Sequence, residues 1–240
     1  MTVVGRFSTR PLYLQVKDML IQRIAAGAWK PGSAIPNEIE LSRELGISVG
    51  TVRKALDEME SERLISRRQG RGTFVIDQTS NEHAVRFSNI RDPKGARIAG
   101  EVESCSVAAA MASDAESRRL QLRNSEPIFH IHRVRTHKEA PLMVEDVTVP
   151  QSRFPGLPQE EDVSPSIVVL AHRYGVLLGR AEEKVGVTAA KGGIAKALKV
   201  AEGTPLLTLD SVVYAIDGRP IEWRVAHCHL SDNYYLAEMS

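Results

Sequence analysis

Two arginines and two glutamates in the second half of the chain could together bind an anion. In the segment HIHRVRTH, the strand period of two places Ile131, Arg133 and Arg135 on one face. Two guanidinium groups on one face repel each other unless an anion lies between them. That anion is either a carboxylate of this protein or a carboxylate or phosphate of a ligand. Glu145 and Glu222, on later strands, could pair with the arginines or accept hydrogen bonds from a ligand, so both interpretations stay open.

A second group of residues, in the first third of the chain, suits contact with nucleic acid. The segment LISRRQGRGTFVI predicts a tight hairpin, with strands at Leu64–Arg67 and Thr73–Ile76 around a basic, glycine-rich tip. Such a tip can lie in or beside the minor groove. Upstream, Ser48 is expected to cap a helix whose small first residues allow close approach to DNA. Arg53, on the outer face of that helix, could reach a guanine edge or a backbone oxygen.

Three short helices must position these residues. Apolar residues recur at helical spacing over residues 12–24, and Gly27 follows as the end of that helix. Asn37 can cap a second helix, with Glu40 three residues on to complete a capping box, and Gly46 ends it. The third helix starts two residues later, so the pair must turn sharply. This spacing predicts a helix-turn-helix.

The remainder of the chain alternates strand-like and helical segments. An Asp217-Gly218 turn predicts a hairpin between the last two strands. Several hairpins with few long crossovers favour an α+β fold, in which helices pack on a largely antiparallel sheet. The expected strands are Glu101–Ala108, Ile128–Thr136, Leu142–Val149, Lys184–Ala189, Pro205–Ala215 and Pro220–His229, and the expected helices are Asp114–Leu120, Ser166–Tyr174 and Gly193–Leu198.

Length and charge suggest two domains. The polar run DQTSNE follows the hairpin, so we expect one domain at residues 1–76, a linker at 77–83 and a second domain at 84–240. The first segment holds twelve Lys and Arg against eight Asp and Glu, whereas the rest of the chain carries a net charge of −3. A small basic unit joined to a mildly acidic one suits a module that meets phosphate joined to one that does not.

The sequence also bears on location. The longest apolar runs are too short to cross a bilayer, and the first residues show no secretion signal, so we expect a cytoplasmic protein without a membrane partner. Cys105 and Cys228 lie far apart without metal-ligand spacing and are expected to be reduced, buried thiols. His130 with His132, and His227 with His229, have a spacing that can bind metal. Without a confirming carboxylate or cysteine, we expect ordinary packed or surface histidines and no metal or cofactor.

A gapless series of motif residues runs from Pro11 to Val75. It comprises Pro11-Leu12-Tyr13, Gly27, Pro31-Gly32, Pro36, Glu38, Leu41, Thr51-Val52-Arg53, Ala55-Leu56 and Gly70-Arg71-Gly72-Thr73-Phe74-Val75. This series resembles the N-terminal domain of the GntR family of bacterial regulators. The resemblance implies a winged helix-turn-helix that binds double-stranded operator DNA. The residues expected to contact DNA are Tyr13, Glu38, Ile39, Ser48, Val49, Gly50, Thr51, Arg53, Lys54, Arg68, Gly70, Arg71 and Gly72.

Three positions depart from the pattern of that family. Ser usually stands where this chain has Asn37, which exchanges one N-cap residue for another. Arg often stands where this chain has Ile39, and typically where it has Val49. Those arginines commonly help to read the operator, so the half-site of this protein is expected to differ from the usual one.

The second domain resembles the UTRA domain, the effector-binding module of HutC-type GntR regulators, whose fold is similar to that of chorismate lyase. The matching residues are Arg133-x-Arg135, Pro141 with Glu145, Tyr174-Gly175, Ala181-Glu182, Leu206 to Ser211 and Gly218-x-Pro220-Ile221-Glu222. The resemblance favours ligand binding over internal pairing, at Ser88, Asn89, Arg133, Arg135, Glu145, Ser166 and Glu222. Pro165 and Ile167 replace a Ser and a Tyr that can hold phosphate in relatives, which favours a carboxylate effector over a sugar phosphate.

The leading hypothesis is therefore a dimeric repressor that leaves a palindromic operator when a small anionic metabolite binds. It would be cytoplasmic, and associated with the nucleoid when bound to DNA. The alternative is an enzyme, because a chorismate-lyase-like fold could retain lyase chemistry. We expect no enzymatic activity, since the sequence shows no Ser/His/Asp or Cys/His constellation, although a lyase needs neither.

Overall fold

The computed structural model describes residues 10–76, 85, 87–159 and 166–238. Contacts divide the chain into two compact units, Met1–Gln78 and Thr79–Ser240. The expected linker at 77–83 lies outside the described residues. Within the described part of the chain, no helix is both long and apolar enough to cross a membrane.

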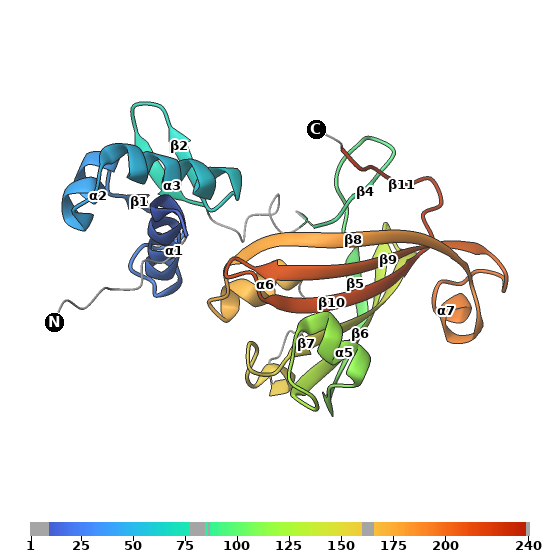
Figure 1. The fold of residues 1–240 in the computed structure, drawn as a ribbon. Helices are drawn as coiled ribbons and strands as arrows, with labels where there is room; N and C mark the ends of the chain where they lie inside the picture. Colours follow the sequence, from blue (N-terminus) through green and yellow to red (C-terminus); the bar gives the residue numbers. More distant parts are fainter. Residues whose placement is uncertain (1–9, 77–84, 86, 160–165, 239–240) are drawn as a thin grey trace. The chain divides into compact units, whose positions relative to one another are not determined.

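The first unit is a three-helix bundle with a small sheet (Figure 1). It comprises α1 (Leu12–Ala25), β1 (Ala34–Ile35), α2 (Glu38–Leu45), α3 (Val49–Ser61), β2 (Ile65–Arg68) and β3 (Gly72–Val75). β3 lies between β1 and β2 in an antiparallel sheet. The core is built from one face of each helix, with Leu20, Leu41, Val52, Leu56 and Met59 all fully buried. The helix-turn-helix and the hairpin are confirmed, whereas the two-residue β1 was too short to show a period in the sequence.

Local capping defines the turn between α2 and α3. The Asn37 side chain accepts hydrogen bonds from the amides of Ile39 and Glu40, and the Glu40 carboxylate accepts one from the Asn37 amide, which completes the expected capping box. Gly46 ends α2 with a φ of 66°, in the left-handed region that favours glycine. Ser48 then caps α3 through the Thr51 amide. These caps set the start of α3, the helix expected to face DNA.

The second unit is built on one large antiparallel sheet, and the α+β fold class is confirmed (Figure 1). Its six strands lie in the order β5-β6-β7-β10-β9-β8, and β4 and β11 form a separate two-stranded sheet. The strands are β4 (Ile90–Arg91), β5 (Glu101–Met111), β6 (Pro127–His137), β7 (Ala140–Pro150), β8 (Leu178–Ala189), β9 (Pro205–Ala215), β10 (Pro220–Cys228) and β11 (Tyr234–Tyr235), and the helices are α5 (Asp114–Leu120), η1 (Leu157–Gln159), α6 (Ile167–Arg173) and α7 (Gly192–Ala197).

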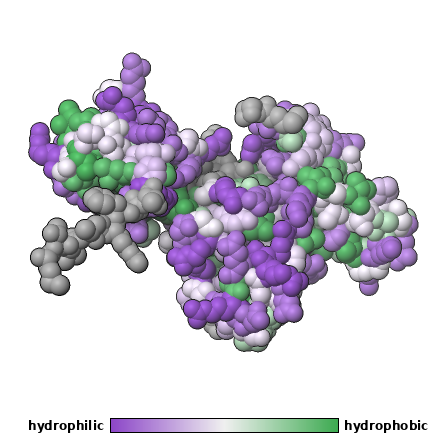
Figure 2. All heavy atoms as spheres, viewed as in Figure 1, coloured by the Kyte–Doolittle hydropathy of each residue, from purple (hydrophilic) through white to green (hydrophobic). Residues whose placement is uncertain are grey.

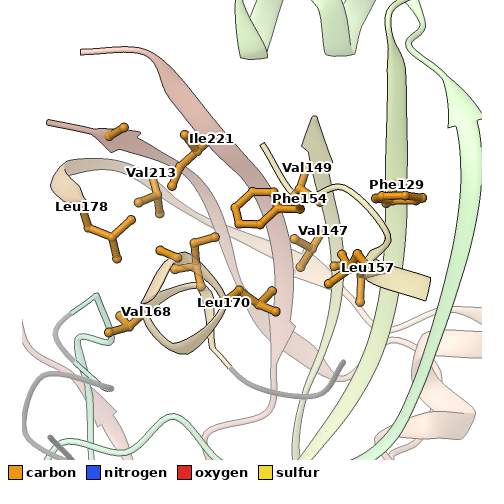
Figure 3. Packing of buried hydrophobic residues seen from close by; sticks show 14 residues of the cluster. Phe129, Val147, Val149, Phe154, Leu157, Val168, Leu170, Leu178, Val213 and Ile221 are labelled. Atoms are coloured by element: carbon orange, nitrogen blue, oxygen red, sulfur yellow. The ribbon is translucent and has the colours of Figure 1, made fainter. Parts of the chain in front are cut away.

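The main core lies between α6 and one face of the large sheet. Figure 3 shows Val168 and Leu170 of α6 among the sheet residues Val147, Val213 and Ile221, all of them buried. Because side chains alternate along a strand, the neighbours of these sheet residues face the other side, where α5 packs. Hydrophilic residues dominate the region around α5 in Figure 2. The same face also carries a smaller apolar cluster, with Val134, Val144 and Leu206, where α7 packs.

The second unit contains β4, β11 and η1, which the sequence did not predict, and two further details differ from expectation. β8 begins at Leu178, six residues before the predicted start, because it is an exposed edge strand whose first half alternates poorly. Cys228 is buried, but Cys105 on the edge strand β5 is exposed. The prediction of two buried thiols is therefore wrong for Cys105, because β5 is an edge strand whose residues are exposed or only partly buried along its whole length.

Candidate functional site

Glu145 is completely buried in the large sheet and is approached by three arginines. The register of β6 and β7 places Arg133 directly opposite Glu145. Arg133 Nε lies 2.9 Å from Glu145 Oε1, and Arg135 Nε donates a 2.6 Å hydrogen bond to the same oxygen. Arg224 on β10 is farther away, with Nη1 at 3.8 Å from Glu145 Oε2. Arg133 and Arg135 therefore both form ion pairs with Glu145 inside the protein.

The two buried glutamates of this cluster have pKa values displaced in opposite directions. Burial raises the pKa of Glu145, but the charges of Arg133, Arg135 and Arg224 outweigh it and lower the pKa from 4.5 to about 2. Burial also raises the pKa of Glu222, and there the attraction of Arg224 and Arg133 does not overcome it. Such divergent carboxyl groups in one cluster are typical of binding and catalytic sites.

A small cavity of about 30 Å³ lies beside the cluster. That volume is about the space that one water molecule occupies in the liquid. Apolar side chains of Phe87, Ile167 and Leu209 form part of its wall. Five of the seven effector residues expected from the sequence line it, namely Ser88, Arg133, Arg135, Ser166 and Glu222.

The other two expected effector residues do not line this cavity. Asn89 Nδ2 donates a 3.1 Å hydrogen bond to Tyr235 Oη and lies 3.4 Å from Glu183 Oε1. Tyr235 Oη in turn donates to Glu183 Oε1 at 2.8 Å. Asn89 thus ties the start of β4 to β11, while the Glu145 carboxylate pairs with the arginines.

Three polar groups at the cavity have unused hydrogen-bonding capacity. Within the part of the chain that the structure describes, Ser166 Oγ, Glu222 Oε2 and Arg224 Nε are buried and make no hydrogen bond. Ser166 occupies the N-cap position of α6, yet its hydroxyl makes no capping bond. Buried polar atoms without partners are uncommon in folded proteins. Three of them around one cavity therefore point to a polar ligand.

Arg224 also lines the cavity but was missed in the sequence. The signal was present, because Glu222 and Arg224 are two residues apart on one strand and so share a face. The two like charges of Arg133 and Arg135 on β6 were the stronger signal for an anion-binding site in the sequence. That Arg224 meets the same cluster depends on β10 pairing with β7, which the local sequence does not specify.

The first histidine pair, His130 and His132, does have carboxylate neighbours, so the expectation that no carboxylate lies near is wrong for this pair. His130 Nε2 lies 2.5 Å from Glu116 Oε1, and His132 Nδ1 lies 2.7 Å from Asp146 Oδ1. Asp146 is the cross-strand partner of His132, and Glu116 comes from α5. Among the described residues, no group of three or more His, Cys, Asp and Glu side chains could hold a metal ion.

The start of α3 is small and exposed. Gly50 is open to solvent, and a Cβ built on it would come no closer than 3.9 Å to Ser48 Oγ. Arg53 keeps 61% of its side chain exposed, while its Nε pairs with Glu38 Oε2 at 2.8 Å. Lys54 Nζ lies 4.1 Å from the ring centroid of Tyr13 on α1. Ile39 is exposed and Val49 is partly exposed, and Thr51 is partly exposed beside its cap.

The hairpin tip presents two of its three arginines. Arg68 and Arg71 are exposed, with Arg68 held 4.7 Å from the Phe74 ring centroid. Gly70 and Gly72 have φ values of 68° and 107°, so glycine is required for this turn. Arg67 instead turns back to α3, where its Nη1 lies 2.6 Å from Asp57 Oδ1 and 2.9 Å from Glu60 Oε2. The tip is therefore basic because of Arg68 and Arg71.

The first unit is a helix-turn-helix with a basic hairpin, and the second unit of the same chain holds a charged cavity. Together these features define a ligand-responsive DNA-binding regulator. The family model for bacterial regulatory proteins of the gntR family matches residues 12–75, and that for the UTRA domain matches residues 96–233. The chain therefore belongs to the GntR family and carries a UTRA effector-binding domain. It is a metabolite-responsive transcriptional regulator that binds DNA, as the sequence resemblance implied.

Known relatives agree with this assignment. The chain is 26% identical over 215 residues to the mannosyl-D-glycerate transport/metabolism system repressor MngR of Escherichia coli, covering 89% of this chain and 90% of that protein. It is 37% identical over 139 residues to the histidine utilization repressor of Pseudomonas putida, covering 57% and 55% respectively. The structure of PhnF from Mycobacterium smegmatis shares the fold, with a TM-score of 0.55 and 23% identity over 94% of this chain and 99% of that one. These names give no support to a chorismate-lyase-like enzyme.

Proposed function

We propose that this protein is a homodimeric repressor that leaves a palindromic operator when a small anionic metabolite binds to its second domain. In this proposal residues 1–76 bind DNA, 77–83 link the domains, and 84–240 bind the effector. The protein acts in the cytoplasm, at the nucleoid when bound to its operator, and catalyses no reaction. Support for repression comes from the names of MngR and of the histidine utilization repressor.

The DNA-binding surface is proposed to combine the start of α3 with the hairpin tip. Small residues at the start of α3 allow its amides to approach the groove, and an exposed Arg53 can exchange its bond to Glu38 for one to DNA. Arg68 and Arg71 extend from the turn that Gly70 and Gly72 permit. The proposed contacts are the thirteen residues expected from the sequence, and paired half-sites require the dimer because one recognition helix reads only a few base pairs.

The effector site is proposed to be the cavity beside the arginine cluster. The observation that carries this proposal is the set of buried, unpartnered polar atoms of Ser166 and Glu222 at a cavity also lined by arginines. Ser88, Arg133 and Arg135 complete the wall, and Glu145 and Asn89 hold the wall residues in place. A metabolite needs more than the 30 Å³ present, so binding requires the wall to move apart.

That movement is proposed to couple effector binding to DNA release. Part of the wall is Phe87 and Ser88, which follow the linker closely in the chain. A ligand that moves these residues acts on the segment that joins the cavity to the DNA-binding domain. The effector then needs only to bind better to the wider form to shift the population away from the DNA-binding form.

The proposal is tested with operator selected from random DNA by the full-length protein. We expect a palindromic site, an affinity that falls steeply with salt, and release of DNA by a fraction of cell-extract metabolites. Purified protein should leave chorismate unconsumed. A protein that selects no DNA sequence, or that turns over chorismate, would contradict the proposal.

A further inference from the structure

We propose that Arg224 receives the anionic group of the effector, that Glu222 and Ser166 complete a subsite for a monocarboxylate, and that Arg133 and Arg135 act as supports of Glu145. This inference rests on the proposed effector site and specifies its chemistry. It assigns different roles to three arginines that share one cavity.

Arg133 and Arg135 are already engaged and sealed. Both place Nε within 2.9 Å of Glu145 Oε1, and Arg135 Nη1 also donates a 3.1 Å hydrogen bond to the Gly100 carbonyl. Their side chains are only 1% and 7% exposed. An anion that bound to them would have to compete with a buried carboxylate for the same guanidinium groups. These two arginines therefore stabilise the carboxylate of Glu145 and the strand pair that carries it.

Arg224 is less tightly paired than Arg133 and Arg135. Its charged contacts are long, at 3.8 Å to Glu145 Oε2 and 3.6 Å to Glu183 Oε2, and its Nη2 lies 3.5 Å from Ser211 Oγ. Its Nε is buried without a hydrogen-bond partner among the described residues. With 18% exposure, its side chain is the most accessible of the three. Longer charged contacts and greater exposure therefore distinguish Arg224 from Arg133 and Arg135.

Two neighbouring groups suit the same anion. Glu222 precedes Arg224 by two residues on β10 and lines the same cavity. Its raised pKa favours a protonated carboxyl, which can donate a hydrogen bond to a carboxylate. The Ser166 hydroxyl at the start of α6 is a further donor that has no hydrogen-bond partner among the described residues. Three donors of different kinds are therefore available to one carboxylate.

Charge balance favours a monoanion. Arg133, Arg135 and Arg224 face the carboxylates of Glu145 and Glu183, which leaves one positive charge for Glu222 or a ligand to balance. Burial raises the pKa of Glu222, which favours the anion of a ligand in that place. One carboxylate neutralises that charge, whereas a phosphate dianion would leave a negative charge in a buried setting, which is costly. The apolar wall formed by Phe87, Ile167 and Leu209 suits a ligand whose remaining body is apolar.

The test uses acetate as the probe, because it is little more than a carboxylate and suits a small cavity, with inorganic phosphate for comparison. Side-chain Nε–H resonances of the arginines are followed by NMR on the full chain, with Arg224→Met to assign the signal. We expect acetate to shift the Arg224 signal saturably and more strongly than phosphate does. Arg224→Met should weaken acetate binding at least about tenfold, because a charge-assisted hydrogen bond is lost.

Matched variants separate binding from structure. Arg135→Met removes an equivalent charge from the same cavity and should lower the melting temperature clearly more than Arg224→Met, because the buried Glu145 carboxylate loses the arginine that donates a hydrogen bond to it. Glu222→Gln should retain acetate binding, since its amide still donates. The inference is overturned if acetate causes no saturable shift of Arg224, if phosphate binds more tightly, or if Arg224→Met binds acetate like the native protein. Operator binding is measured separately, so its failure would count against the proposed function and not against this subsite.

Discussion

Replacing Glu145 with Gln should destabilise the second unit in a way that depends on pH. The amide has the shape of the carboxylate but not its charge, so Arg133 and Arg135 lose the anion that both now contact within 2.9 Å. The variant tests whether the arginine cluster is held together by this single carboxylate. Glu222→Gln is the matched control, because Glu222 is equally buried and lies in the same cluster.

The magnitude follows from the pKa of Glu145. A shift from 4.5 to about 2 corresponds to about 3 kcal/mol of stabilisation at neutral pH. Removing one partner of a buried ion pair typically costs about 3–5 kcal/mol, which agrees. The folded pKa lies below the unfolded value, so the stabilisation is present above pH 4.5 and is lost as the pH falls towards 2. Glu145→Gln should therefore lower the free energy of unfolding by about 3 kcal/mol at pH 7 and by much less near pH 2.

The opposite sign is expected for Glu222→Gln. Because the folded pKa of Glu222 is raised, its stabilising effect is present below the unfolded pKa and is lost as the pH rises through the folded pKa. Replacing it with a neutral amide should leave the stability at neutral pH unchanged or increased. The pair of variants thus distinguishes a carboxylate whose pKa the fold lowers from a carboxyl group whose pKa burial raises.

The assay is urea unfolding followed by the fluorescence of Trp223, in a Trp29→Phe background so that only the second unit reports. Curves are measured from pH 7 down to the acid limit of the native protein. Equal unfolding free energies for native protein and Glu145→Gln at pH 7 would refute the reasoning. So would a constant difference between them across the acid range, because that would indicate lost packing and not lost charge.

Three further predictions concern DNA. Val49→Arg should increase the preference for a guanine-containing half-site by about 1–3 kcal/mol, because arginine can bind guanine where valine can only touch a thymine methyl; recovery of the same sequences by both proteins in a binding selection would count against this. Arg53→Ala should weaken operator binding in both the native and the Val49→Arg backgrounds, measured by titration, since an exposed donor is lost. The protein should have a dimeric mass in solution, and a monomeric mass with and without operator would exclude the symmetric model.

Local features of the sequence were sufficient for the caps and for strand faces. Asn37, Gly46 and Ser48 act within three or four residues of themselves, so their roles could be predicted without knowledge of the rest of the chain. The same holds for Arg133 and Arg135, because the period of a strand alone places them on one face. The hairpins with glycine in their turns, at Gly70 and at Asp217-Gly218, could likewise be located from the sequence, although strand ends such as the start of β8 could not.

Only the tertiary structure decided what those side chains meet. Lys138 and Glu139 form a two-residue turn with positive φ, an arrangement that usually uses Asn and Gly. A β-bulge between Arg135 and Thr136 then shifts the pairing by one residue, which brings Glu145 opposite Arg133. Arg224 reaches the same cluster because β10 pairs with β7, and Ser166 because α6 packs on the sheet. Sequence periodicity fixes the direction of a side chain over a few residues. Burial, ion pairing and the presence of donors without partners depend on contacts between segments far apart in the chain. The different roles of Arg133, Arg135 and Arg224 could therefore be inferred only from the fold.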